Sequence, residues 1–78
     1  MGAETKLRDL GLCAALASLG FEVLEIERDA GGQGYFIFIK TAELEQAISA
    51  YWSNTLEVKA RTYSDALKML KSRLYSER

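Results

Sequence analysis

The sequence predicts a small α+β domain with the element order α-β-β-α-(β)-α, in which three helices pack on a small antiparallel sheet. Apolar residues recur at helical spacing in three separate segments. Two runs rich in β-branched and aromatic residues lie on either side of a glycine-containing turn, which is typical of a β-hairpin. The 78 residues contain no proline and no linker-like stretch, so we expect one domain over residues 1–78.

The first helix is expected over residues 9–19, because this segment is apolar nearly all round. Asp9 or Thr5 can accept hydrogen bonds from its free N-terminal amides. Gly20 supplies the left-handed residue that ends the helix in a Schellman motif. We expect residues 1–8 to form a flexible N-terminal segment.

The hairpin is expected to join a strand over residues 21–29 to a strand over residues 35–40, with a flexible tip around the glycines between them. The second helix follows over residues 42–53, where Thr41 is the predicted N-cap. Residues 55–60 alternate apolar and polar side chains, so the sheet is either a hairpin or has these residues as a third strand. The last helix is expected to open with a capping box from Thr62 to Asp65.

The second strand of the hairpin is apolar on both faces. Tyr35, Ile37 and Ile39 alternate with Phe36 and Phe38, so each set lies on its own face of the sheet. Three helices in so short a chain are expected to cover one face only. We therefore expect the other face to meet a second copy of the chain or another protein.

Composition restricts how this small domain can be stabilised. A single cysteine excludes an intramolecular disulfide, and the lack of histidine argues against a zinc site. We therefore expect no metal and no cofactor, and association with a partner is the remaining route to stability for a domain of this size. Residues 10–19, the longest helical apolar stretch, are too short to cross a bilayer, and we expect a cytoplasmic protein without a membrane contact.

Catalytic chemistry is poorly represented in the sequence. Without histidine, the usual base that activates a serine or cysteine nucleophile is missing. Cys13 lies among alanines and leucines and is expected to be an inert core residue. Glu25 and Glu27 share a strand face and could act as an acid and base pair, but a solvated face is the expected role. We expect a protein that is not an enzyme and has no catalytic residues.

The first functional hypothesis is a self-associating interaction module, with a homodimer as the simplest assembly. Its expected contact residues are Tyr35, Ile37 and Ile39 of the second strand, together with Trp52. Tryptophan is over-represented at interfaces, and Trp52 lies beside the inward stripe of its helix instead of within it. Packing of Trp52 into the domain's own core is the alternative, and an unidentified protein partner is the alternative to a second copy.

The second hypothesis is a nucleic-acid-binding accessory protein that uses the basic end of the chain. Residues 20–58 carry seven acidic and two basic side chains, whereas residues 59–78 carry six basic and two acidic ones. The candidate phosphate contacts are Arg61, Lys68, Lys71, Arg73 and Arg78. An overall net charge of −1 argues against coating of nucleic acid by bulk electrostatics. A solvated helix face, or contact with the acidic middle of a neighbouring copy, also accounts for these cations.

Several short signatures spread over the chain resemble a family of short bacterial domains of unknown function, often carried by phages and other mobile elements. They are Asp9, Leu10 and Leu12; Leu19 and Gly20; Phe36 and Phe38; Tyr51 and Trp52; and Leu70, Lys71, Arg73 and Leu74. Cys13 stands where this family is expected to have alanine. The resemblance implies a mobile-element or gene-cassette setting, and it implies no activity.

Overall fold

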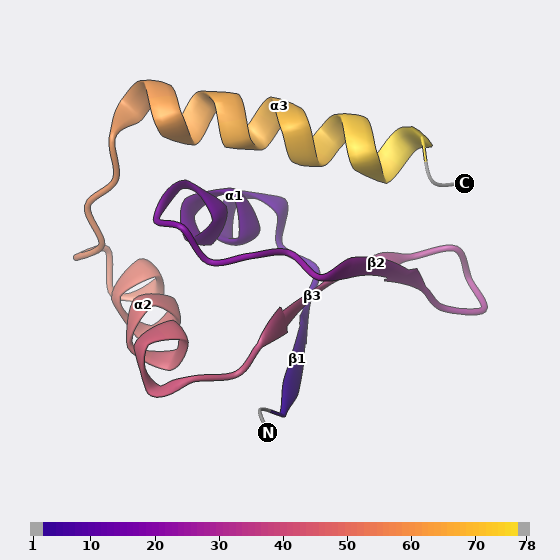
Figure 1. Cartoon of the computed structure of the whole chain (residues 1–78), viewed down its shortest axis with the longest axis horizontal. Coiled ribbons are helices and arrows are strands. Elements are labelled where there is room, and N and C mark those ends of the chain that lie inside the picture. The colour runs from indigo at the N-terminus through magenta and orange to yellow at the C-terminus, as the bar shows by residue number, and fades with distance from the viewer. Residues whose placement is uncertain (1–2, 77–78) are drawn as a thin grey trace.

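The computed structural model describes residues 3–76, which form a three-stranded antiparallel sheet and three helices (Figure 1). The elements follow the chain as β1 (Glu4–Leu7), α1 (Leu10–Ser18), β2 (Glu25–Arg28), β3 (Gly34–Ile39), α2 (Ala42–Trp52) and α3 (Ala60–Ser76). The α+β class and the helix-covered antiparallel sheet are therefore confirmed. The order differs from the predicted one, because the chain begins with a strand.

The third strand of the sheet comes from the N-terminal segment and not from residues 55–60. The strand order is β1-β3-β2, so β3 is central and antiparallel to both neighbours. β1 pairs with β3 so that Leu7 lies opposite Phe36 and Glu4 opposite Ile39. The expected flexibility of residues 1–8 is thus wrong for residues 4–7. Residues 55–59 adopt no regular secondary structure.

The central helix, α1, has the predicted ends. The Asp9 carboxylate accepts the Leu12 amide at 2.9 Å, which confirms Asp9 as the N-cap. Gly20 has a φ of 101°, and the amides of Gly20 and Phe21 donate to Ala17 and Leu16. This is the Schellman pattern, and it stops the helix before the turn into β2.

The apolar core lies around α1, between the sheet, α2 and α3 (Figure 1). Phe36 and Phe38 of β3 point into it and are 1% exposed. Its remaining members come from all three helices and from the segment before β2: Leu12, Cys13, Ala14, Leu16, Val23, Leu44, Ala47, Ala66 and Leu70. The helices therefore cover one face of the sheet, as predicted.

The other two helices differ in how well their starts were predicted. Thr41 caps α2 by accepting the Leu44 amide at 3.0 Å, as expected. In contrast, α3 begins at Ala60, and the Tyr63 amide already donates to the Lys59 carbonyl. Thr62 is therefore inside the helix, and the predicted capping box from Thr62 to Asp65 is wrong.

Residues 55–59 cross from α2 to α3 in an irregular segment. Asn54 turns the chain with a positive φ of 63°, and the amides of Thr55 and Leu56 then donate to the Ala50 carbonyl. Leu56 and Val58 are half-buried while their neighbours are exposed. The possible third strand over residues 55–60 is therefore wrong. The alternation reflects one inward side of an irregular segment, whose Leu56 packs against the core and pairs with no strand.

Candidate interaction surfaces

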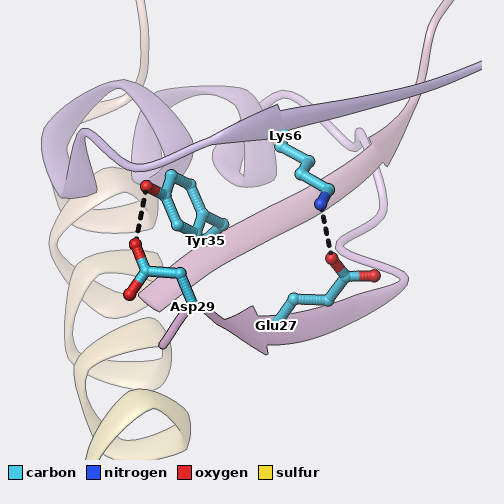
Figure 2. Close-up of polar contacts among 4 residues, drawn as sticks. All are labelled: Lys6, Glu27, Asp29 and Tyr35. Atoms are coloured by element: carbon cyan, nitrogen blue, oxygen red, sulfur yellow. Dashed lines mark hydrogen bonds and ion pairs between the residues drawn. The ribbon is translucent and has the colours of Figure 1, made fainter. Parts of the chain in front are cut away.

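The outer face of the sheet, away from the helices, carries Tyr35, Ile37 and Ile39 as predicted. The register places Lys6 of β1 and Glu25 of β2 opposite Ile37. Lys6 reaches diagonally across β3 to Glu27 of β2, with Nζ 2.9 Å from the carboxylate oxygen (Figure 2). Ile37 is 0% exposed although it lies outside the main core. Ile37 therefore presents no exposed side-chain surface in this structure, and its expected place at a contact stays a prediction.

Tyr35 is held by the turn of the hairpin. Its hydroxyl donates to the Asp29 carboxylate at 3.2 Å (Figure 2). The other carboxylate oxygen of Asp29 accepts the amides of Gly31 and Gln33 at 2.9 Å and 3.0 Å. These bonds, with the Gln33 amide foremost, hold the pKa of Asp29 below its ordinary value. The turn is closed by hydrogen bonds, although the glycines alone predicted a flexible tip.

Arg28 connects the hairpin to α3 through hydrogen bonds, a role that the sequence did not predict. Its guanidinium donates to the Gly32 carbonyl at 3.1 Å and to the Leu74 carbonyl in the last turn of α3. A cation at this end of a helix also meets the negative end of the helix dipole. Leu74 packs so close to β3 that a Cβ at Gly34 would lie 2.5 Å from it. Only tertiary proximity identifies Arg28, because 46 residues separate it from Leu74.

Ile39 lines a separate surface feature, a hollow at the C-terminal end of β3. This cavity has a volume of ≈ 440 Å³ and is lined by Gly20, Phe21, Glu22, Leu24, Phe38, Ile39, Thr41 and Glu43. Ile39 is 40% exposed and Leu24 is exposed to a similar extent. Glu22 and Glu43 are the only ionisable residues in this lining, and both are acidic. We call this feature the acidic hollow.

Trp52 lies at the C-terminal end of α2, whereas the acidic hollow lies at its N-terminal end. The indole is 62% exposed and meets the Tyr51 ring edge-on at 5.0 Å. An α-helix rises about 1.5 Å per residue, so the length of α2 separates Trp52 from Thr41. The four predicted interface residues therefore do not form one patch. Trp52 is not part of the apolar core either.

The basic residues of α3 divide into exposed and half-buried ones. Arg61, Lys68 and Lys71 are exposed, and Tyr75 is 64% exposed at the end of the same face. Arg73 is half-buried on the side toward Leu70. Arg78 lies outside the described residues. We call Lys68, Lys71 and Tyr75 the basic stripe, because their spacing of three and four residues places them on neighbouring turns.

The groups considered as reactive from the sequence, Cys13 and the pair Glu25 and Glu27, lie within the described residues 3–76. Cys13 is fully buried, and burial, followed by the charge of Asp9, raises the pKa of its thiol to about 12. Of the predicted carboxylate pair, Glu27 is engaged by Lys6. No group of three or more histidine, cysteine, aspartate or glutamate side chains in the described part of the chain could hold a metal ion.

The fold and these surfaces define a small α+β domain with two oppositely charged surface features. A family model for a domain of unknown function, DUF5659, matches residues 3–76, so the chain belongs to this family. No curated protein and no solved structure is significantly similar to the chain. The expected resemblance to a family of unknown function is confirmed at that level. Within residues 3–76, none of the helices has the length and apolar character needed to span a membrane.

Proposed function

We propose that this domain is a non-enzymatic interaction module that associates with further copies of itself in a head-to-tail manner. The basic stripe of one copy packs against the acidic hollow of the next. One observation carries this proposal: the two features have opposite charge, and each presents exposed apolar surface. Lys68 and Lys71 precede the exposed Tyr75 on successive turns of α3, while Glu22, Glu43 and the partly exposed Ile39 all line the acidic hollow.

The positions of the two features favour a contact between copies over a contact within one chain. α3 runs along one side of the molecule, and the connection from β3 to α2 lies on the other (Figure 1). A stripe that meets a different surface on its partner is a heterologous contact, which builds rings or open chains. Tyrosine is among the residues that most often contribute strongly to interfaces. Of the residues expected at the contact from the sequence, only Ile39 is part of this arrangement.

The proposal can be tested with two charge-reversal variants, measured separately and as a mixture. Lys68→Glu/Lys71→Glu makes both features acidic, and Glu22→Lys/Glu43→Lys makes both basic. We expect the wild type to associate at high protein concentration and each variant alone to be monomeric. An equimolar mixture of the two variants restores association, because every contact again joins opposite charges. The measurement is absolute mass by light scattering after gel filtration, over a wide dilution series.

Two controls separate this contact from general charge effects. Arg8→Glu/Lys59→Glu changes the net charge as much as the α3 variant does, but at exposed residues outside the basic stripe, and should leave association unchanged. Raising the salt from about 0.1 M to about 1 M shortens the Debye length from ~10 Å to ~3 Å and should weaken association. A wild type that is monomeric at every concentration and salt would refute the proposal, as would a mixture that stays monomeric.

Nucleic-acid binding is the second candidate, favoured by the exposure of three cations on α3. If Arg61, Lys68 and Lys71 each contact a phosphate, the logarithm of the affinity should fall with log salt at a slope of about −3 for duplex DNA. Asp65 is exposed on the same helix and opposes such binding. A fluorescein-labelled duplex titrated at ~50 mM salt decides the matter, since phosphate contacts are strongest there. No change in anisotropy would exclude this function.

The proposal also includes the setting implied by the resemblance. We propose that the chain is encoded on a bacterial mobile element or phage and acts in the cytoplasm. The genes on either side of its own test the first part, and cell fractionation tests the second. Flanking genes without any link to mobile elements would remove the genetic setting while leaving the proposed contact intact.

A further inference from the structure

A cavity of ≈ 380 Å³ lies where α1, the C-terminal end of α2 and the first turn of α3 meet. Ala15, Tyr51, Asn54, Leu56, Val58 and Tyr63 line it. We call it the tyrosine cavity. It shares no lining residue with the acidic hollow or the basic stripe. The irregular segment of residues 55–59 closes one side, because Leu56 and Val58 turn inward there.

Two phenol hydroxyls meet over α1 at Gly11. A Cβ at this residue would lie 2.8 Å from the Tyr51 oxygen and 3.4 Å from both the Tyr63 oxygen and a carboxylate oxygen of Asp9. Gly11 therefore leaves the space that both hydroxyls occupy. One turn further along α1, Ala15 is buried yet lies outside the main core, and its methyl group forms part of the cavity wall. The small residues on this face of α1 thus create room beside two hydrogen-bonding groups.

The lining specifies the charge of a ligand. None of the six lining residues is an acid or a base that is ionised at neutral pH. Burial, followed by the nearby Asp9 carboxylate, raises the pKa of Tyr51, so its hydroxyl keeps its proton. An anionic ligand would lose hydration and approach the Asp9 carboxylate beside the hydroxyls, and no lining residue offers a cation an ionic partner. A hydroxyl or carbonyl group can instead bond to tyrosine or to the Asn54 amide.

We propose that the tyrosine cavity binds a small uncharged organic molecule that is mainly apolar and carries one hydroxyl or carbonyl group. Its apolar part lies against Ala15, Leu56 and Val58, and its polar group bonds to the tyrosine hydroxyls. The volume is adequate, because an apolar cavity of about 150 Å³ already holds benzene. This inference stands apart from the proposed self-association, since the two use different residues.

The test is a titration of the 15N-labelled full chain, followed by the amide signals in NMR spectra. The probe is 2-phenylethanol, which combines one ring with one hydroxyl. We expect saturable shifts confined to the residues around the cavity, such as Ala15, Asn54 and Tyr63. Three analogues of similar size examine the polar group and the charge: ethylbenzene, 2-phenylethylammonium and 3-phenylpropionate. Each should bind more weakly than the alcohol.

Variants locate the site and its hydrogen bonds. Tyr51→Phe and Tyr63→Phe each remove one hydroxyl and keep the ring. We expect each variant to lower the affinity for 2-phenylethanol by roughly 3–10-fold, as for the loss of one neutral hydrogen bond. The affinity for ethylbenzene should change little. Gly11→Ala places a methyl group against the Tyr51 hydroxyl and should abolish binding. Gly31→Ala is the matched control, because a Cβ there meets no atom closer than 3.5 Å.

Each outcome decides for or against the proposal. Shifts elsewhere on the molecule, no saturable shift, or unchanged affinity in both tyrosine variants would overturn it. Tighter binding of either ionic analogue than of the alcohol would overturn the uncharged class. If Gly11→Ala does not fold, the two tyrosine variants decide the location. Lys68→Glu/Lys71→Glu should bind the alcohol normally, which keeps this test separate from that of self-association.

Discussion

The two faces of β3 are covered by different means, and the outer face is fully buried only at Ile37, since Ile39 is 40% exposed. Phe36 and Phe38 lie under the helices and belong to one continuous apolar core. Ile37, on the opposite face, lies between Lys6 of β1 and Glu25 of β2 in the register, and Lys6 forms an ion pair with Glu27 on the same face (Figure 2). We infer that these side chains cover it. The inner face is thus closed by tertiary packing and the outer face by the sheet itself.

This difference answers the question of what covers the second apolar face. Lysine and glutamate carry several methylene groups, which can lie over an apolar residue while the charges remain in water. A central strand with neighbours on both sides can therefore bury an isoleucine without a helix or a partner. An apolar outer face in a three-stranded sheet does not by itself predict oligomerisation, and the contact proposed above uses other surfaces.

The largest expected effect comes from breaking the inner face. Phe38→Ala removes a fully buried ring from the core, and we expect it to cost about 3–5 kcal/mol of unfolding free energy. Urea unfolding followed by circular dichroism measures this loss. Ile39→Ala on the same strand is the control, and its loss should be clearly smaller because Ile39 is partly exposed. Equal losses would contradict the assignment of Phe38 to the core.

A second change on the inner face tests the approach of α3 to the sheet. Gly34→Ala places a methyl group 2.5 Å from the end of the Leu74 side chain, so either Leu74 or the helix must move. We expect a loss of about 1–2 kcal/mol, because overpacking is costly but Leu74 can adjust. The comparison with Gly31→Ala in the hairpin turn, where a Cβ meets no atom closer than 3.5 Å, isolates the clash. A Gly34→Ala protein as stable as the wild type would show that α3 lies further from β3.

A smaller effect is expected on the outer face. Ile37→Val removes one methylene group beneath flexible charged side chains, which can collapse into the space. We therefore expect a loss at the lower end of the range for this substitution, about 0.5 kcal/mol. Thermal and urea unfolding together measure it. A loss of several kcal/mol would mean that the outer face is packed as rigidly as the inner one.

The smallest expected effect on stability concerns Lys6, whose aliphatic stem and charge can be removed separately by substitution. Glu27 raises the pKa of Lys6 above its ordinary value of 10.5, through a hydrogen bond and through its charge. The ion pair therefore stabilises the fold below that pH, and its contribution is lost as the pH rises through the raised pKa. Lys6→Met should keep most of the cover over Ile37 and lack this alkaline loss. Lys6→Ala should be less stable than Lys6→Met at neutral pH, and the reverse order would contradict cover by the stem.

Local signals predicted the helix ends well. Asp9, Gly20 and Thr41 each act within a few residues, so their side chain or backbone preference decides the structure on its own. The start of α3 was misplaced because the first turn bonds through Tyr63 and Lys59 and does not use the threonine that the capping pattern favoured. A capping pattern identifies a helix start only when no earlier residue is already helical.

The strands were harder to assign, because pairing joins residues far apart in the chain. β1 has only four residues, of which Leu7 alone is strongly apolar, so it carries little alternation. Residues 55–60 alternate more clearly, but β1 already occupies the free edge of β3. The alternating residues Leu56 and Val58 line the tyrosine cavity instead.

The candidate site residues were predicted by type and not by position relative to one another. Ile39 and Trp52 are exposed as expected, yet α2 holds them at opposite ends. The exposure of Lys68 and Lys71 follows from the helical period and was predictable. The acidic lining of the hollow was not predictable, because Glu22 lies in the segment before β2 and Glu43 in the first turn of α2, and only the fold brings them together.

The sequence by itself determined the helices, the hairpin and the apolar strand β3, since capping, turn formation and periodicity depend on neighbours along the chain. The tertiary structure decided which segment completes the sheet, which charged residues cover Ile37, and that Arg28 reaches the end of α3. It also decided that Tyr51 and Tyr63 meet above Gly11. These contacts join residues distant in the chain, and their partners are fixed only when the whole core packs.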